Sequence, residues 1–292
     1  MNGFLNIKKP AGLTSHDVVA RVRRLVGKGV KVGHAGTLDP AATGVLPLAL
    51  GHATRLIEYL VADTHKGYVG LVRLGVRTAT DDAEGEPIAS APVPTLEDAQ
   101  IEAAVAGLRG NILQVPPIYS ALHHDGKRLY ELARAGQTVE LAPRPVIIYS
   151  LSWERAGDDT LRITVECGKG TYIRSLARDI GAALGCGAHL AALERTLVGA
   201  FRIEDAATLD ELLAEPARLP TLLLPPELAV AEWPAAQLDE TGAQRVRNGM
   251  ALQLPELVGE RARAHGPDGA LLALLRREGE HWRPEKVFAG RP

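Results

Sequence analysis

The stretch KVGHAGTLDPAATGVLPLALG, from Lys31 to Gly51, contains a single acidic residue, Asp39, in a glycine-rich turn. Asp39 is also the only carboxylate between Asp17 and Glu58. The same window contains the basic residues Arg21, Arg23, Arg24, Lys28, Lys31 and Arg55. Additional acids beside these cations would repel phosphate, so the pattern predicts a surface that RNA approaches, with one carboxylate left for chemistry.

Asp39 has two interpretations when it is considered alone. It precedes Pro40, and Asp-Pro commonly starts a turn in which the aspartate caps the following residues. In the functional interpretation, Gly33, Gly36 and Gly44 let a ligand approach the backbone closely. The neighbouring cations would favour the ionised carboxylate, which is a possible nucleophile.

The composition predicts a cytoplasmic protein with one large and one small domain. The chain has 292 residues, 46% of them hydrophobic, and no apolar run near the ~18 residues that a membrane-spanning helix needs. The N-terminus lacks a basic segment followed by an apolar one, so we expect no secretory signal. Cys167 and Cys186 form neither a disulfide framework nor a CxxC pair.

The net charge of −2 conceals an asymmetry. Residues 1–75 contain 10 Lys and Arg against 4 Asp and Glu, a net charge of +6, whereas residues 76–165 contain 8 against 13, a net charge of −5. The basic quarter fits either a polyanion footprint or a solvated helix face. The apolar residues Val18, Val22, Leu25 and Val26 share one face of a predicted helix that ends at Gly27. Its opposite face carries Arg21, Arg24 and Lys28.

Further along the chain, strand and helix patterns mix without regular βαβ alternation. Strands are predicted at Phe4–Ile7, Tyr68–Val76, 144–155 and 160–167. Besides the helix that ends at Gly27, helices are predicted at Ala53–Val61, Leu96–Leu108, Lys127–Ala135 and after Gly170. Thr14 or Ser15 would cap the helix that ends at Gly27, and Thr95 would cap Leu96–Leu108. Five prolines lie within residues 215–234, which suits a linker. We therefore predict an α+β fold with domains at 1–222 and 223–292, the second small and β-rich.

Other motifs give weaker signals. GKGVKVG (27–33) follows a helix, and its third glycine comes one residue late for a dinucleotide fingerprint. The sequence has no P-loop, GxSxG or HExxH motif. His123, His124 and Asp125 are adjacent and point in different directions, so a polar turn is favoured over a metal site.

Several blocks resemble the TruB family of tRNA pseudouridine synthases. GHAGTLDPAATGVLPLALGHATRL is similar to the family's catalytic motif, and NIKKPAGLTSHDVVARVRR to its opening. KGYVGLVRLGVRTATDDAEG, QVPPIYSALHHDGKRLYELARAG and VECGKGTYIRSLARDIGAALGCGAHLAAL follow in the family's order. The resemblance covers residues 3–205, and residues 223–292 resemble, more weakly, the family's PUA-type RNA-binding domain.

The resemblance implies a pseudouridine-synthase fold, a mixed and mostly antiparallel sheet flanked by helices and loops. It also implies isomerisation of one uridine in the T-loop of tRNA, uridine 55 in tRNA numbering. The glycosidic bond breaks, the base rotates, and a carbon of the base reattaches to the ribose. Assistance in tRNA folding is a further role that the resemblance suggests.

The resemblance also assigns roles to individual residues. Asp39 would be the essential carboxylate, and Arg174 in GTYIRS would pair with it. Tyr68, in the K-x-Y motif that begins at Lys66, would stack on the flipped uracil, and Leu193 would form an apolar wall. His34 and Gly36 would lie near the RNA, and Lys66 would also bind the substrate. Alone, Tyr68 and Leu193 would pass for core residues, and Arg174 for a solvent-facing helix residue.

These roles are consistent with the physics of base flipping. Extruding a base costs a few kcal/mol, and stacking on an aromatic side chain restores about 1–3 kcal/mol per base. Phosphate contacts from Arg21, Arg24, Lys28 and Lys31 would add affinity. The reaction needs neither a metal nor an organic cofactor. We expect tRNA, through its T-arm, as the partner of a monomer that needs no membrane and no obligatory protein partner.

Three positions depart from the family pattern, and three other functions compete with the predicted one. His123 replaces a usual lysine, Glu194 an arginine, and Gly67 a polar residue. The rival functions are a non-catalytic RNA chaperone, a synthase that modifies rRNA with guide RNA and protein partners, and an aspartate-based hydrolase of small molecules.

Overall fold

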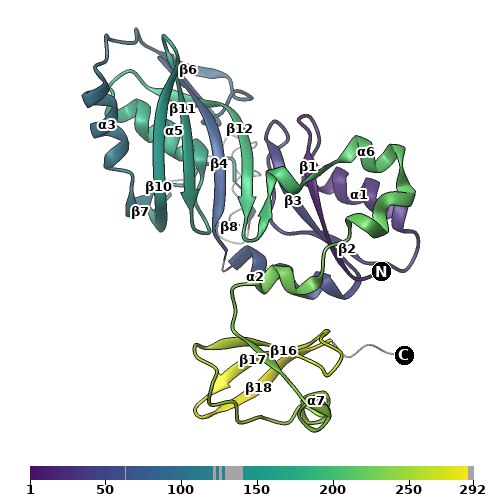
Figure 1. The fold of residues 1–292 in the computed structure, drawn as a ribbon. Coiled ribbons are helices and arrows are strands. Elements are labelled where there is room, and N and C mark those ends of the chain that lie inside the picture. The colour runs from purple at the N-terminus through teal and green to yellow at the C-terminus, as the bar shows by residue number, and fades with distance from the viewer. Residues whose placement is uncertain (63, 121–122, 125–126, 129–140, 289–292) are drawn as a thin grey trace.

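The computed structural model describes residues 1–62, 64–120, 123–124, 127–128 and 141–288. Its main feature is a mixed sheet with the strand order β14-β1-β3-β12-β4-β11-β10-β7, to which β2 and β13 are attached (Figure 1). These strands are β1 Gly3–Lys9, β2 Val32–His34, β3 Thr43–Leu50, β4 Lys66–Leu74, β7 Gly110–Gln114, β10 Arg144–Gly157, β11 Thr160–Cys167, β12 Ala188–Val198, β13 Phe201–Arg202 and β14 Ala207–Thr208. Most neighbouring strands are antiparallel, and the α+β prediction is confirmed.

Strand β12 joins the two halves of this sheet. It pairs with β4 along most of its length but with β3 at only two positions, Glu194 opposite Thr43 and Arg195 opposite Gly44. The β12–β3 pairing is parallel, whereas each half is built largely from antiparallel pairs. The short junction brings together loops and strands that are far apart in sequence.

Each half of the sheet has its own apolar core. In the half formed by β4, β11, β10 and β7, strand residues such as Ile163 and Val165 pack with Leu176 and Ile180 of α5. In the other half, Ile7 and Leu48 pack with Val18 and Val22 of α1. The helices and 3-10 turns are α1 Ser15–Val26, η1 Gly51–Leu56, α2 Ile57–Ala62, α3 Asp98–Ala106, α5 Ile173–Ala183, η2 Ile203–Asp205, α6 Leu209–Ala214, η3 Pro216–Leu222 and η4 Pro226–Val230.

The predicted elements are largely present. Thr14 caps α1, its hydroxyl accepting from the Asp17 N–H, and Gly27 ends the helix. The cap predicted at Thr95 is wrong, because α3 starts after Glu97, whose N–H donates to Gln100 Oε1 at 2.8 Å. The helix predicted at Lys127–Ala135 is wrong at its first two residues: Lys127 and Arg128 form β9, which pairs with His123–His124 (β8). Residues 129–135 lie outside the described residues.

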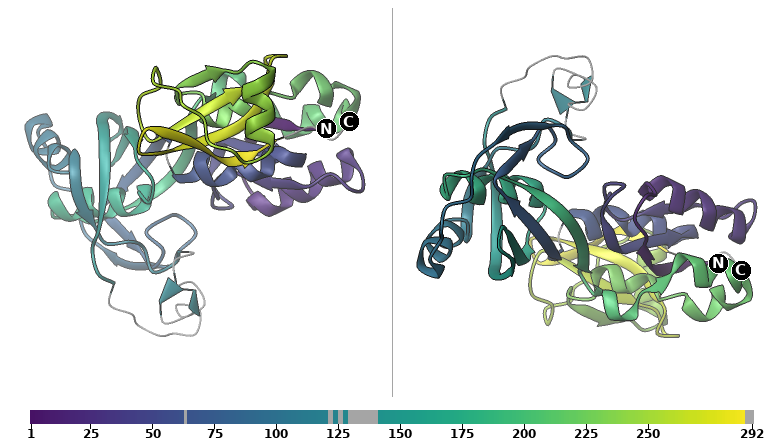
Figure 2. Two further views of the ribbon diagram at one scale, coloured as in Figure 1. Left: turned by 90° about the horizontal axis from the view of Figure 1, so that it is seen from below. Right: turned by 90° about the horizontal axis from the view of Figure 1, so that it is seen from above.

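A smaller domain follows the proline-rich segment. Its sheet has the order β15-β16-β17-β18, and α7 packs beside it. The elements are β15 Ala235–Gln237, α7 Glu240–Arg247, β16 Arg261–His265, β17 Leu271–Glu278 and β18 His281–Val287. Seen from below, this domain lies over the half of the body that contains β1 and β3 (Figure 2, left). The division between residues 222 and 223 stays a prediction.

Contacts from η1 and α2 to β18 connect the small domain to the body. Tyr59 donates from its hydroxyl to Glu285 at 3.0 Å, and Arg55 donates to the Val287 carbonyl at 2.7 Å. Lys286 pairs with Glu58. Among the described residues, no helix combines the length and the apolarity needed to cross a bilayer.

Gly44 is required by the junction between β3 and β12. A Cβ atom there would overlap the carbonyl oxygen of Arg195, and φ is +103°. The ligand approach predicted for Gly44 is therefore wrong: another strand's backbone occupies that space. Gly44→Ala should lower the free energy of unfolding by about 3 kcal/mol, measured by urea denaturation.

Gly29 provides the matched control for Gly44. Its φ is +93°, but no atom lies within 4 Å of the position a Cβ would take. Gly29→Ala therefore tests the cost of backbone conformation alone, about 1 kcal/mol. Equal losses in the two variants would show that the overlap with Arg195 contributes nothing.

Candidate active site

Asp39 lies in the loop between β2 and β3, and hydrogen bonds with the start of α1 anchor that loop. The hydroxyl of Ser15 accepts from the Leu38 N–H at 2.9 Å and donates to the Leu38 carbonyl at 3.2 Å. The Ala42 N–H donates to the Asp39 carbonyl at 3.1 Å, which closes a turn. The loop is therefore fixed on both sides of Asp39, as catalytic geometry requires.

Lys9 holds the same loop against the end of β1. It is fully buried, and its Nζ donates to the carbonyls of Leu13 at 2.7 Å, Pro10 at 2.9 Å and Pro40 at 3.1 Å. Burial lowers the pKa of Lys9, and nearby Asp39 opposes this effect. Sequence reasoning missed Lys9, because a lysine after a strand is typical of a surface turn.

Arg174, in the first turn of α5, connects Asp39 to the acidic loop. Its Nη2 lies 3.1 Å from Asp39 Oδ2 and donates to the Tyr119 carbonyl at 3.0 Å. Its Nη1 lies 3.2 Å from Asp82 Oδ2 and donates to the Thr80 carbonyl, also at 3.2 Å. The side chain of Arg174 is only 9% exposed, against 44% for Asp39. Arg174 is therefore fixed, while the carboxylate can be reached from solvent.

The predicted clearing of acids around Asp39 holds in sequence but not in space. The loop between β5 (Val76–Thr78) and β6 (Pro87–Ser90) brings Asp82 and Glu84 to a pocket that Asp39 also lines. Asp82 accepts from Thr80 Oγ1 as well as from Arg174. The predicted acidic loop is thus part of the site, and its Asp82 is paired with an arginine from a distant helix.

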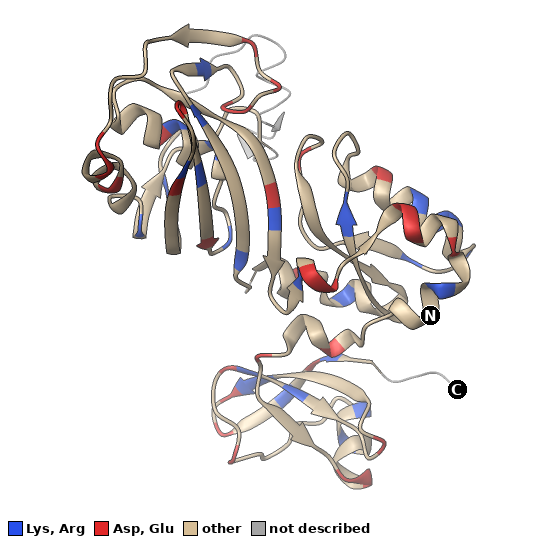
Figure 3. Cartoon of the chain, turned by 45° about the horizontal axis from the view of Figure 1, so that its top comes forward, with Lys and Arg blue, Asp and Glu red and all other residues tan. Residues whose placement is uncertain are grey.

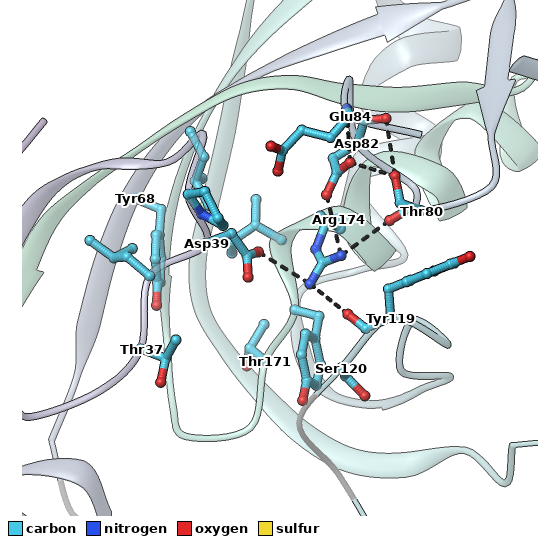
Figure 4. Close-up of a pocket in the computed structure, with 15 residues that line it drawn as sticks. Thr37, Asp39, Tyr68, Thr80, Asp82, Glu84, Tyr119, Ser120, Thr171 and Arg174 are labelled. Atoms are coloured by element: carbon cyan, nitrogen blue, oxygen red, sulfur yellow. Dashed lines mark hydrogen bonds and ion pairs between the residues drawn. The ribbon is translucent and has the colours of Figure 1, made fainter. Parts of the chain in front are cut away.

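A pocket of about 630 Å³ opens beside this ion pair (Figure 4). Tyr68 of β4 and Leu193 of β12 line it together with Asp39 and Arg174. Its other lining residues are Thr37, Leu38, Pro40, Thr80, Asp82, Glu84, Tyr119, Ser120, Thr171, Tyr172 and Ile173. The lining therefore combines aromatic and apolar side chains with a carboxylate held by a guanidinium.

Tyr68 is buried at the edge of this pocket, with 9% of its surface exposed. Burial raises the pKa of Tyr68, while Arg195 acts in the opposite direction. The phenol is therefore neutral at neutral pH, and its ring presents an uncharged face for stacking.

Three other predicted residues lie outside the pocket lining. His34, in β2, is half-buried and packs edge-on against His16, with ring centroids 5.1 Å apart. Burial, and then His16, lower the pKa of His34, which favours its neutral form. Gly36 accepts from Arg195 through its carbonyl. Lys66 starts β4, and burial lowers its pKa.

The basic residues of α1 are not brought to the pocket either. Ser15, at the start of the helix, holds the Asp39 loop, whereas Arg24 lies in the last turn, about 14 Å along the axis, and Lys28 follows the end of the helix. Arg24, Lys28 and Lys31 are exposed, and Arg21 is half-buried. Blue and red positions are interspersed over both halves of the body (Figure 3). Any RNA contact from this helix would lie away from the reacting base.

The structure gives a local reason for two of the family departures. Glu194 pairs with Lys8 at 3.0 Å, so its charge is matched across the junction. A Cβ at Gly67 would lie 2.8 Å from Thr196 Oγ1 and 2.9 Å from Leu197 Cβ, which leaves no room for a larger residue. The side chain of His123 lies outside the described atoms.

The arrangement supports chemistry on a planar group that stacks on Tyr68 in a pocket that Leu193 also lines. A reacting atom in the pocket would meet the exposed carboxylate of Asp39, which Arg174 orients through a charge-assisted contact. The side chains around the pocket would then supply the electrostatic stabilisation and the positioning of the reacting group.

Comparisons with known proteins match nearly the whole chain. Residues 23–173 match the model of the TruB family pseudouridylate synthase (N terminal domain), residues 174–231 that of the tRNA pseudouridylate synthase B C-terminal domain, and residues 233–289 that of tRNA Pseudouridine synthase II, C terminal. A tRNA pseudouridine synthase B from Aromatoleum aromaticum is 49% identical over 87% of this chain and 82% of its own. One from Thermobifida fusca is 46% identical over 99% of both chains.

A solved structure is similar as well. A chain from a Cbf5-Nop10-Gar1 complex superposes with a TM-score of 0.76 at 27% identity, covering 98% of this chain and 85% of that one.

Proposed function

Since this chain belongs to the TruB family of pseudouridylate synthases and is a tRNA pseudouridine synthase, an isomerase, we propose that it modifies the T-loop uridine, uridine 55 in tRNA numbering, with Asp39 as the essential carboxylate. The observation that carries this proposal is the ion pair between Asp39 and Arg174 at the mouth of a pocket lined by Tyr68 and Leu193. This ion pair places a reactive carboxylate in a pocket that can hold a flat base.

The reaction would begin with extrusion of the uridine from its loop, which costs a few kcal/mol. Stacking of the base on Tyr68, in the pocket that Leu193 also lines, would recover about 1–3 kcal/mol. Because Asp39 is the exposed member of the ion pair with Arg174 and lines the pocket, the ribose of a bound uridine would meet its carboxylate.

The chemical step then breaks the glycosidic bond and forms a bond from ribose to a carbon of the base. Asp39 either attacks the sugar or takes a proton from it to give a glycal-like intermediate. The base rotates in the pocket and its carbon bonds to the sugar, which breaks the bond to Asp39 in the first route and takes the proton back from Asp39 in the second. A proton then leaves that carbon while the freed nitrogen gains one. Tyr68, which lines the pocket, would be the side chain to take part in this proton transfer. Atoms balance without water or electrons.

The decisive test uses the purified protein and a T-arm hairpin with no other component. Pseudouridine should form at the T-loop uridine, detected by pseudouridine-specific chemical labelling because the isomers have equal mass. A hairpin with cytidine at that position is the control. Tight binding without product would instead favour an RNA chaperone, and activity that requires added proteins and guide RNA would favour the guided alternative. Assistance in tRNA folding stays a separate proposal.

The exposed basic end of α1 gives a second prediction. If Arg24 and Lys28 contact phosphates, Arg24→Glu with Lys28→Glu should weaken binding uniformly and reduce the salt slope by about 2. Fluorescence binding of T-arm RNA at several salt concentrations measures this. Arg162→Glu, on the exposed side of β11, is the control and should leave the slope unchanged. An unchanged slope in the double variant would place the footprint elsewhere.

A further inference from the structure

Arg195 lies behind the pocket, between the loop of Asp39 and the strand of Tyr68. It is 1% exposed. Its Nε donates to the Val45 carbonyl at 2.8 Å, and its Nη2 and Nη1 donate to the carbonyls of Gly36 at 3.1 Å and Thr37 at 3.3 Å. Two of these three acceptors belong to the loop that leads to Asp39.

These acceptors are neutral, which makes the buried charge unusual. Burying a guanidinium is costly, and a carboxylate usually compensates. Here the titratable group that acts most on Arg195 is the phenol of Tyr68. A leucine or methionine would avoid the buried charge but leave these three carbonyls without their donor, so the guanidinium does more than fill space.

Strand register explains the contact between Arg195 and Tyr68. The two residues are direct partners in the antiparallel pairing of β12 with β4. Side chains of direct partners lie on the same face of a sheet, with Cβ atoms about 5 Å apart. Arg195 is also the partner of Gly44 in β3. One residue thus touches both halves of the sheet where they meet.

We propose that Arg195 is a positioning residue for the isomerisation. Its planar guanidinium group (the fork) fixes the Asp39 loop to the Tyr68 strand through hydrogen bonds, and its positive charge lies beside the Tyr68 phenol. Arg195 does not line the pocket, so it acts through these two neighbours. The inference rests on the proposed function only where it predicts turnover.

The electrostatic half of the proposal has a definite sign. Burial raises the pKa of Tyr68, Cys167 of β11 and Asp39 of the facing loop raise it further, and Arg195 lowers it. Replacing Arg195 with a neutral residue should therefore raise the pKa of the Tyr68 phenol. A lysine would keep the charge but lose the planar fork that reaches three carbonyls.

The charge is tested without RNA. Tyr68 is replaced by 3,5-difluorotyrosine, a more acidic phenol, and its titration is followed by ¹⁹F NMR in otherwise unchanged full-length protein. Arg195→Gln should move the midpoint up by about one pH unit or more, and Arg195→Lys by less than about half a unit. Arg73→Gln, near the far end of β4, is the control and should not move it.

The fork is tested by turnover in protein with natural Tyr68. Single-turnover rates on the T-arm hairpin should fall about 10–100-fold in both Arg195→Gln and Arg195→Lys, with RNA affinity within about threefold, because the loop of Asp39 loses its fixed position. Arg73→Gln should keep the native rate.

The two measurements separate the possible failures. An unmoved fluorine midpoint in folded Arg195→Gln, or a native rate in Arg195→Lys, overturns the proposal. If Arg195→Gln does not fold, a slow Arg195→Lys with a native midpoint supports it. Absence of pseudouridine with the native protein would refute the proposed function but leave the fluorine result interpretable.

Discussion

Asp39→Asn should reduce single-turnover formation of pseudouridine by about 10⁴-fold or more, the scale of losing a reacting group. Asparagine is nearly isosteric, so the loop held by Ser15 and Lys9 should keep its shape. The amide can neither attack the sugar nor accept its proton. T-arm affinity should stay within about tenfold, because the lost contribution is mainly to the transition state.

The matched control is the same substitution at Asp82, the other carboxylate that touches Arg174. Asp82→Asn removes one ion pair but leaves Asp39 and Arg174 together 3.1 Å apart. Its rate should fall by only about 10–100-fold. Normal turnover in Asp39→Asn, or a greater loss in Asp82→Asn, would contradict the assignment of the essential carboxylate.

Arg174→Met should damage both folding and turnover. Removing this buried cation leaves Asp39 and Asp82 facing each other and strands the carbonyls of Thr80 and Tyr119. We expect the free energy of unfolding to fall by about 2–3 kcal/mol, discounted for the partly exposed Asp39, and turnover by about 10³-fold. Urea denaturation and single-turnover assays measure the two losses.

Arg178, one turn later on α5, is the control for Arg174. It pairs with Asp81 at 2.9 Å and donates to the Val115 carbonyl at 2.8 Å, outside the pocket lining. Arg178→Met should also lower stability but keep turnover within about tenfold, since it does not hold the reacting carboxylate. Equal turnover losses in both variants would mean that Arg174 acts only by supporting the fold.

Local sequence pattern predicted much of the fold correctly. Val18 and Val22 at helical spacing, with Thr14 before them and Gly27 after them, identified α1. Residues 144–155 and 160–167 identified β10 and β11. Thr95 failed as a cap because a threonine before a helix pattern does not fix the first turn, and Glu97 takes that place. The pattern at Lys127 failed because helical spacing in a short segment competes with hairpin pairing.

The sequence by itself determined which groups are available: an isolated Asp39 in a glycine-rich turn, the motifs around Tyr68 and Arg174, and apolar periods that commit each segment to a helix or a strand. Only the tertiary structure decided which of these groups meet. Asp82 joins the site from the acidic loop, and Arg195 is buried with hydrogen bonds to the loop of Asp39, although neither has a distinguishing local pattern. The physical reason is that charge pairing and close packing depend on distance in space, and the junction of β12 with β3 and β4 sets those distances.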